Sequence, residues 1–287
     1  MIDEVPVIER IIRLALEEDL GTGDVTTDAI LDPDLRGEAC LIAREELVLA
    51  GLPVFKRVFH ELCPELVVEG VCKDGDLIAP NTEVCLLKGR LAPILRAERT
   101  ALNFLQRMSG IATLTRRYVE RVKPCNVKIL DTRKTVPGLR KFDKYAVRMG
   151  GGFNHRFGLS DGILIKDNHI AAAGSIFRAV ELAKKHASHM LKIEVEVEDL
   201  AGVEEACRAG ADVILLDNMR PAELVKAVEL IKGQALVEAS GGITLDTVKD
   251  VAETGVDMIS VGALTHSPRA SDFSLEISPN PDGLEAC

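Results

Sequence analysis

The second half of the chain repeats one unit: a short apolar run of β-rich composition, a polar residue at its end, and then a stretch with helical spacing. Ser175 and Pro221 are start signals for two of the helical stretches. Strands that alternate with helices in this way form a parallel sheet covered by helices. The apolar runs predict strands at residues 127–130, 163–165, 191–197, 213–216, 235–237 and 258–261.

Polar residues at the strand ends favour a closed α/β barrel over an open doubly wound sheet. In a barrel the carboxyl ends of all strands meet at one mouth, so several strands contribute to one site. An open sheet gathers its ligand at one switch point, and no G-x-G-x-x-G motif follows a first strand here. The polar strand ends lie at 131–134, 166–167, 196, 217–218, 240–242 and 262.

The first hundred or so residues follow a different pattern, with strand-like segments split by turn signals. A short helix is predicted near 53–62, and a longer, arginine-rich helix at 93–123 connects this region to the barrel. These features predict a separate α+β domain. Residues 272–277 alternate polar and apolar side chains and could add a strand to either domain. The strand-like segments are GEACLIA, ELVLAG, LVVEGVC and EVCLLKG.

Composition predicts a soluble globular protein. The 287 residues are 47% hydrophobic, enough for a sizeable core in one large or two ordinary domains. No apolar run approaches the roughly 18 residues of a membrane helix. The chain starts with an acidic, amphipathic segment that does not resemble a secretory signal, so we expect a cytoplasmic protein. Seven cysteines without a C-x-x-C pair argue against a disulfide framework and a zinc site.

The charge distribution singles out one part of the chain. The whole sequence has a net charge of -10 and only 3% aromatic residues, which argues against a nucleic-acid partner. Residues 88–166 reverse the balance, with 18 Lys and Arg against 5 Asp and Glu. Because a glycine run at 150–152 lies among these cations, we expect a site for a small, densely charged anion.

Glycine pairs follow the two last predicted strands. Ser240-Gly241-Gly242 and Gly262-Ala263 are segments of the kind whose backbone N–H groups approach a phosphate in a barrel. Either segment alone is equally an ordinary turn, and the occurrence of both after consecutive strands favours the phosphate site.

Carboxylates follow the middle strands. Glu196 and Asp217 end neighbouring predicted strands, where carboxylates hold sugar hydroxyls or hydrated Mg²⁺. Glu194, Glu196 and Glu198 alternate, so they point to one side of a strand unless some lie past its end or pair with Lys192.

Cations lie at the earlier strand ends. Arg133, Lys134, Arg156 and Lys166 are candidates to bind carboxylates or phosphates, although a solvated basic face is the usual alternative for such residues. His155, beside Arg156, could orient a ligand. His169 and His266 are as consistent with a structural role.

Long motifs of unusual composition give the chain a family resemblance. The sequence closely resembles the quinolinate phosphoribosyltransferases, also called carboxylating nicotinate-nucleotide pyrophosphorylases. The resemblance implies an α/β fold class: an N-terminal α+β sandwich domain at 1–110, then an incomplete (β/α) barrel of parallel strands at 111–270, with a tail at 271–287 able to return to the first domain. The motifs are EEDLGTGDVTT, AERTALNFLQRMSGIAT, TRKTVPGLR, KYAVRMGGGFNHRFGLSDGILIKDNHI, IEVEVE, LLDN, EASGGIT and VGALTHS.

The resemblance also implies a role for each candidate residue. Catalytic residues would be Lys134, Lys166, Glu196 and Asp217. Quinolinate would be surrounded by Thr132, Arg133, His155, Arg156 and Lys166, with Arg99 entering from another subunit of a homo-oligomer, a dimer at least. Phosphoribosyl pyrophosphate would be held by Lys134, Glu196, Asp217, Ser240, Gly241, Gly242, Val261, Gly262 and Ala263. Mg²⁺ would be held by Glu196 and Asp217, through water.

Two departures from the family pattern leave this expectation intact. Val136 stands where a second threonine is common, and Ala270-Ser271 stands where an Ala-Leu pair is more frequent. Neither change removes a charged group.

The implied activity is phosphoribosyl transfer to quinolinate with decarboxylation, giving nicotinate mononucleotide, pyrophosphate and CO₂ in NAD biosynthesis. Preorganised charges suit this chemistry, because a cation-like sugar forms as pyrophosphate leaves. Three alternatives stay open. One is a molybdenum-associated paralogue with another acceptor, one is a Schiff-base aldolase that uses Lys166, and one is a catalytically silent anion-binding protein.

Overall fold

The chain forms two compact units, each assembled from separate stretches of sequence. The structure is a computed structural model that describes residues 6–279. The first unit contains the residues up to Leu114, Pro137–Gly150 and the residues from Pro268 onward, and the second contains Thr115–Val136 and Gly151–Ser267. Between residues 6 and 279, no helix has the length and apolar character needed to cross a membrane.

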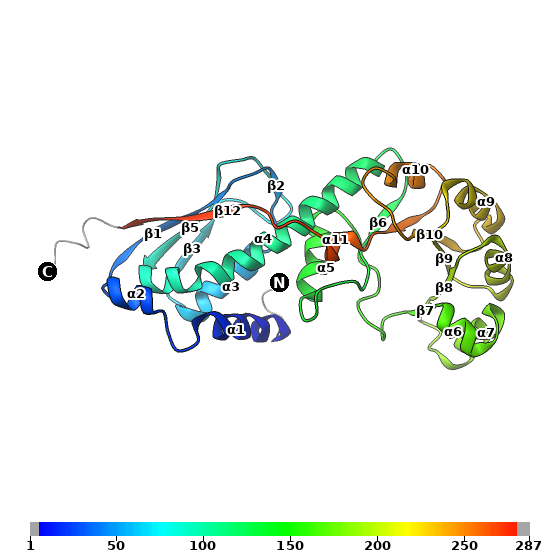
Figure 1. The fold of residues 1–287 in the computed structure, drawn as a ribbon, viewed down its shortest axis with the longest axis horizontal. Helices are drawn as coiled ribbons and strands as arrows, with labels where there is room; N and C mark the ends of the chain where they lie inside the picture. The colour runs from blue at the N-terminus through cyan, green and yellow to red at the C-terminus, as the bar shows by residue number, and fades with distance from the viewer. Residues whose placement is uncertain (1–5, 280–287) are drawn as a thin grey trace. The chain divides into compact units, whose positions relative to one another are not determined.

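A four-stranded antiparallel sheet is the centre of the first unit. Its strand order is β12-β1-β5-β3, and β2 pairs with β4 apart from it. In β1 the buried residues recur at every second position, as in a sheet with one face on a core. The tail strand β12 pairs along β1 from Gly37 opposite Pro279 to Ala43 opposite Phe273 (Figure 1). Residues 280–287 of the expected tail lie outside the described chain.

The elements of the first unit match most of the predicted pattern. The predicted short helix near 53–62 is confirmed, whereas the segment ELVLAG forms a strand of only two residues. The bounds are α1 Pro6–Leu20, α2 Val25–Ile30, β1 Arg36–Ala43, β2 Leu47–Val48, α3 Leu52–Leu62, β3 Val67–Gly70, β4 Leu77–Ile78, β5 Thr82–Arg90, α4 Leu91–Val122, α5 Arg140–Met149 and β12 Phe273–Pro279. The long helix predicted at 93–123 is α4, whose last residues, from Thr115, belong to the second unit.

Helix α5 belongs to the first unit, although it lies in sequence between two strands of the second. Phe142 stacks on Phe104 of α4, with ring centroids 5.1 Å apart. Arg107 of α4 donates hydrogen bonds of 2.9 and 2.8 Å to the carboxylate of Asp143, which is fully buried. Because a buried carboxylate requires such a partner, this pair specifies where α5 packs.

Six parallel strands form the second unit, in the order β6-β11-β10-β9-β8-β7. From β7 to β11 each strand pairs with the next one in the chain, and β11 then pairs with β6. This is the circular order of a parallel barrel, in which each strand pairs with the next one and the last pairs with the first. The barrel is incomplete because no pairing within the described chain joins β6 to β7. The expected fold class, an N-terminal α+β domain and an incomplete parallel barrel, is confirmed.

Helices cover the outer side of this curved sheet (Figure 1). The predicted helix starts are confirmed: Ser175 caps α7 by accepting a hydrogen bond from the Arg178 amide, and Pro221 opens α9. The bounds are β6 Lys128–Leu130, β7 Ile163–Ile165, α6 Asp167–Ala173, α7 Ile176–His186, β8 Ile193–Val197, α8 Leu200–Ala209, β9 Val213–Asp217, α9 Pro221–Ile231, β10 Leu236–Ser240, α10 Val248–Ala252, β11 Met258–Ser260 and α11 Ala263–His266. Every predicted strand of this half is therefore present.

Gly110→Ala should destabilise the first unit, because α4 and the segment before β12 approach each other at Gly110. A Cβ there would lie 2.0 Å from the carbonyl oxygen of Arg269. The clash should outweigh the gain of about 1 kcal/mol in helix propensity, and we expect a net loss of about 2 kcal/mol in the free energy of unfolding by urea titration. Gly158→Ala is the control, since nothing lies within 4 Å of its Cβ position. Equal stability of the two variants would contradict the close approach.

Candidate active site

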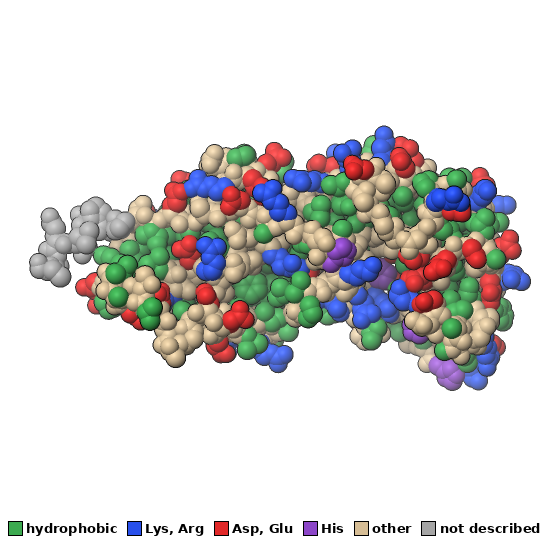
Figure 2. Space-filling model, in the orientation of Figure 1, with side chains coloured by type: hydrophobic (Ala, Val, Ile, Leu, Met, Phe, Trp, Pro, Cys, Tyr) green, Lys and Arg blue, Asp and Glu red, His purple; other side chains and the backbone are tan. Residues whose placement is uncertain are grey.

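A cavity of about 570 Å³ lies at the carboxyl ends of the parallel strands in the second unit. All six strands, or the loops directly after them, contribute to its lining. On the face shown in Figure 2, Lys and Arg side chains gather near β7, and acidic side chains lie over β8 and β9. The strand ends therefore meet at one mouth, as their polar residues predict.

The cavity brings together nearly all the residues expected at the site. Arg99 is the exception: it is exposed on the part of α4 that belongs to the first unit, and it does not line this cavity. The expected residues that do line the cavity are Thr132, Arg133, Lys134, His155, Arg156, Lys166, Glu196, Asp217, Ser240, Gly241, Gly242, Val261, Gly262 and Ala263.

Alternation along the strands divides the lining into a mouth and a floor. Parallel strands point toward the mouth, and residues two apart share a face, so the earlier residue of each pair lies deeper. The mouth residues are Lys166, Glu196, Asp217 and Ser240. Two positions earlier lie Leu164, Leu215 and Glu238, which also line the cavity, and Glu194, which does not; these four residues are called the floor. Glu194 and Glu238 are only 8% and 2% exposed.

The mouth carboxylates are held by their neighbours. Lys166 Nζ donates to Glu196 Oε2, and this ion pair connects β8 to the end of β7. The Asn218 side-chain amide donates to Asp217 Oδ2 at 2.7 Å. An ammonium group held by a carboxylate is a poor nucleophile, which argues against the alternative of a Schiff-base aldolase at Lys166.

The turn after β10 depends on glycine. Gly241 has φ +94°, and a Cβ on it would lie 2.3 Å from Asn218 Oδ1. Only a glycine fits so close to Asn218 in the left-handed region. The turn after β11 is similarly tight, because a Cβ on Gly262 would lie 3.1 Å from Lys134 Cδ. Both turns thus expose backbone to the cavity, as a phosphate site requires.

Two guanidinium groups, those of Arg133 and Arg156, form a basic part of the lining. Arg156 Nη1 donates to the carbonyl oxygen of Gly162 at 2.9 Å, and its buried Nε has no hydrogen-bond partner. Burial and then the nearby charge of Arg133 lower the pKa of Arg156 from its ordinary value. Since a guanidinium stays protonated even so, an anion bound here would relieve the repulsion between the two side chains.

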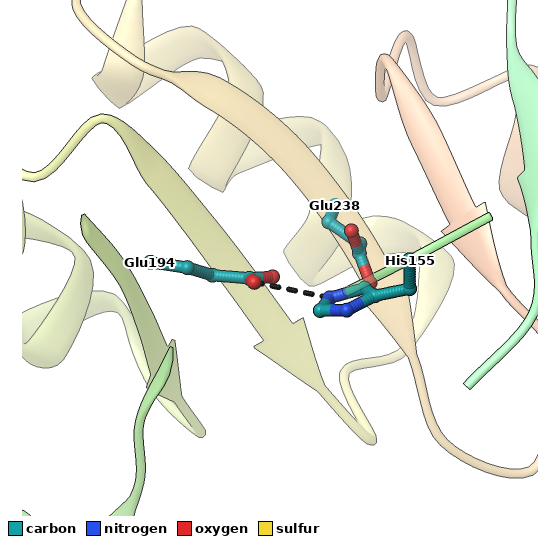
Figure 3. Close-up of side chains that lie close together, drawn as sticks. All are labelled: His155, Glu194 and Glu238. Carbon is teal, nitrogen blue, oxygen red and sulfur yellow. Dashed lines mark ion pairs between the residues drawn. The ribbon is translucent and has the colours of Figure 1, made fainter. Parts of the chain in front are cut away.

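His155 forms a buried cluster with two glutamates of the floor. Its Nε2 lies 3.0 Å from Glu194 Oε2 and 3.7 Å from Glu238 Oε1, and both carboxylates point toward the ring (Figure 3). The Arg156 amide donates to His155 Nδ1 at 2.8 Å. With Nδ1 as acceptor, the proton of the ring lies on Nε2, which faces Glu194. Both ring nitrogens are therefore used within the protein.

Asp131 fixes the loop that carries His155. It is fully buried at the end of β6, where it accepts hydrogen bonds from Asn154 Nδ2 at 2.6 Å and from the His155 amide at 2.9 Å. The position of His155 in the lining thus depends on the buried carboxylate of Asp131.

Glu238 is a charged lining residue that the sequence analysis missed. Burial, with the charge of Glu194 as a second cause, raises the pKa of Glu238 to about 7. Its Oε1 and Glu194 Oε1 are buried without a hydrogen-bond partner. A signal was present in the sequence, because Glu238 lies two residues before Ser240 and so shares its face of the strand.

Of the other candidates from the sequence, His266 lines the cavity, whereas Glu198 and His169 do not. Glu198 is exposed past the end of β8, so only Glu194 and Glu196 of the alternating run face inward. His169 Nδ1 accepts from the Lys166 amide at 3.0 Å, a structural contact at the start of α6. His266 lines the cavity and lies 2.6 Å from Ser267 Oγ through Nδ1.

A partial α/β barrel with paired guanidinium groups, lysines, carboxylates and glycine turns around one cavity is the framework of an enzyme for densely anionic substrates. Comparison of the sequence with known families identifies the family of this enzyme. Residues 24–109 match the N-terminal domain of quinolinate phosphoribosyl transferase and residues 111–276 match the C-terminal domain. The chain belongs to the quinolinate phosphoribosyl transferase family.

Relatives match along almost the whole chain. A Bacillus subtilis protein named probable nicotinate-nucleotide pyrophosphorylase (carboxylating) is 45% identical over 270 residues, covering 94% of this chain and 93% of its own. The chloroplastic nicotinate-nucleotide pyrophosphorylase (carboxylating) of Arabidopsis thaliana is 44% identical, covering 94% and 82%. The solved nicotinate-nucleotide pyrophosphorylase of Francisella tularensis superposes with a TM-score of 0.92 at 42% identity, covering 97% and 99%.

Glu238→Gln should make the protein more stable at alkaline pH. A carboxyl group with a raised pKa in the folded state binds more protons folded than unfolded between about pH 4.5 and 7, so stability falls as pH rises through that range. Gln carries no charge at any pH. We expect the variant and the wild type to be similar at pH 4.5, and the variant to gain at most about 3 kcal/mol at pH 8.5. Urea titrations at both pH values measure this. A variant that is less stable than the wild type at pH 8.5 would contradict the claim that the charged form of Glu238 destabilises the folded protein.

Proposed function

We propose that this protein transfers the phosphoribosyl group of phosphoribosyl pyrophosphate to quinolinate with loss of CO₂. The products are nicotinate mononucleotide, pyrophosphate and CO₂, which makes the enzyme a pentosyltransferase of NAD biosynthesis. The observation that carries the proposal is the content of one cavity: a pair of guanidinium groups and a lysine for a dicarboxylate, beside carboxylates and glycine turns for a phosphorylated sugar. The name of the matched family supports the same acceptor.

Quinolinate would bind at the basic part of the lining. Arg133, Arg156 and Lys166 supply cations for its two carboxylates, and guanidinium groups bind carboxylates through paired hydrogen bonds. Thr132 adds a hydroxyl at the same wall. His155, whose ring nitrogens are engaged by Glu194 and the Arg156 amide, shapes the wall and fixes the backbone of Arg156.

Phosphoribosyl pyrophosphate would bind along the ends of β8 to β11. Glu196 and Asp217 are the proposed partners of the ribose, and the turns at Ser240–Gly242 and Val261–Ala263 are the proposed site of the 5-phosphate. Lys134 packs against Gly262 and supplies positive charge at the same end. These assignments place the sugar between the phosphate turns and the quinolinate cations, as in-line transfer needs.

Mg²⁺ is the proposed cofactor. Glu196 and Asp217, at neighbouring strand ends, give a set of carboxylate oxygens of the kind that Mg²⁺ prefers, usually with water between. When bound, the ion would stabilise charge on the departing pyrophosphate. The protein side chains orient both substrates and exclude water from the reacting carbon.

The proposed assembly is a homo-oligomer, at least a dimer, acting in the cytoplasm. Arg99 is exposed and lies outside the cavity of its own chain, which is consistent with a role in the site of a second copy. This contribution would add one more cation for quinolinate.

The proposed reaction is tested with purified protein, quinolinate, phosphoribosyl pyrophosphate and Mg²⁺. We expect nicotinate mononucleotide and CO₂ in equal amounts, with nicotinate inactive as a control acceptor, because its missing carboxylate leaves a guanidinium group without a partner. Binding of phosphoribosyl pyrophosphate without turnover of quinolinate would contradict the proposal and favour the paralogue with another acceptor.

Arg133→Ala should weaken the use of quinolinate selectively. Loss of a charge-assisted, paired hydrogen bond should raise the KM for quinolinate about 10- to 100-fold, while the Kd of phosphoribosyl pyrophosphate, measured by calorimetry, stays near that of the wild type. Arg133→Lys keeps the charge and should recover only part of the loss.

Lys185→Ala is the matched control for Arg133→Ala, since it removes one positive charge from an exposed position at the end of α7. Its KM should equal that of the wild type. An unchanged KM for quinolinate in Arg133→Ala would remove Arg133 from the site.

A further inference from the structure

The floor of the cavity holds an acid that the proposed binding roles leave unused. Glu238 is 2% exposed yet lines the cavity, and its Oε1 has no hydrogen-bond partner. A buried polar atom without a partner costs free energy of order 1–3 kcal/mol. A carboxyl group kept in that state on a cavity wall is therefore a candidate for contact with a ligand.

The proposed reaction needs a proton at the carbon that loses CO₂. Once the ring nitrogen carries the sugar, loss of the C2 carboxylate leaves an electron pair on C2, and nicotinate mononucleotide forms only when that pair takes up a proton. The enzyme therefore needs an acid beside the pyridine ring.

Other proton carriers around the cavity are engaged elsewhere. Lys166 is paired with Glu196 at the mouth, and the Nε2 proton of His155 faces Glu194. Lys134 and His266 lie against Gly262, at the end assigned to the phosphate, and His266 Nδ1 is 2.6 Å from Ser267 Oγ. Glu238, by contrast, lines the cavity two residues before Ser240 on β10, deeper than these mouth groups, and its Oε1 has no hydrogen-bond partner.

We propose that Glu238, as a carboxylic acid, donates the proton that C2 takes up when the C2 carboxylate leaves as CO₂. The inference rests on the proposed function. The bond between C2 and the carboxylate carbon breaks, and its electron pair stays on C2. That pair then forms the C–H bond with the Glu238 proton, which leaves Glu238 as a carboxylate. A proton from water restores the acid after the product has left, so the step needs no further reactant.

The surroundings of Glu238 favour its acid form near neutral pH. Glu194 on β8 and Asp131 at the end of β6 place negative charge beside it, while His155 and a hydrogen bond from Ser260 on β11 act in the opposite sense. Burial is the largest influence, and its effect raises the pKa of Glu238. An acid whose pKa lies near the working pH is well matched to proton transfer.

The experiment separates the two halves of the reaction in Glu238→Gln. With enzyme in excess over quinolinate labelled in the C2 carboxylate, a rapid-quench time course follows pyrophosphate and CO₂ in one turnover. We expect pyrophosphate to form within about threefold of the wild-type rate, whereas CO₂ and nicotinate mononucleotide form about 100-fold more slowly. The ribosylated dicarboxylate should accumulate between them.

Glu229→Gln is the matched control, because it makes the same change at an exposed residue of α9 that does not line the cavity. In that variant pyrophosphate and CO₂ should keep the wild-type ratio.

The wild-type rate of CO₂ release should fall as pH rises past about 7, when Glu238 loses its proton, and this fall should be absent in Glu238→Gln.

Three results would overturn the inference. One is CO₂ release in Glu238→Gln within threefold of the wild type. Another is a parallel fall of pyrophosphate and CO₂, which would make Glu238 a binding or packing residue. If the wild-type enzyme forms neither product, the proposed function is itself wrong, and that outcome is recognised before any variant is measured.

Discussion

Like charges held close together are the constraint on which the cavity depends. Arg133 and Arg156 repel each other on one wall, and Glu194 and Glu238 repel each other on the floor. Neither arrangement is favourable by itself; a rigid framework holds the side chains in place, and a proton on Glu238, whose pKa is raised to about 7, relieves the repulsion on the floor. Parallel strands in fixed register provide that framework. A ligand then binds to charges that are already in position, so binding does not have to reorder them.

The alternation of strand residues gives this framework two functions at once. The mouth residues are partly exposed and are the proposed contacts of the ligand, whereas Glu194 and Glu238, two positions deeper, are buried and contribute charge around His155. Glu196 and Glu194 on β8 illustrate the difference, since one pairs with Lys166 and the other with His155. One carboxylate is therefore open to the cavity while its neighbour, 2 residues earlier in the strand, orients a loop.

Much of the fold and the mouth could be predicted from the sequence, because they depend on local patterns. Apolar runs with polar ends marked the strands of the barrel, and motifs such as TRKTVPGLR marked the cations of the lining. Contacts between distant segments could not be predicted in this way. The packing of α5 depends on Arg107 and Asp143, and neither residue carries a local sign of its partner. Glu238 was missed for a related reason, because its importance comes from Glu194 and His155, which other segments supply.

The pairing of β12 with β1 has a consequence for synthesis on the ribosome. Gly37 lies opposite Pro279, so the sheet of the first unit lacks a strand until residues 273–279 have emerged. The barrel strands emerge earlier, and β11 ends at Ser260. During that interval β1 presents an unpaired edge to the surroundings, and unpaired edges recruit strands from other chains. The nascent protein is thus expected to rely most on chaperones late in translation, for its N-terminal rather than its C-terminal unit.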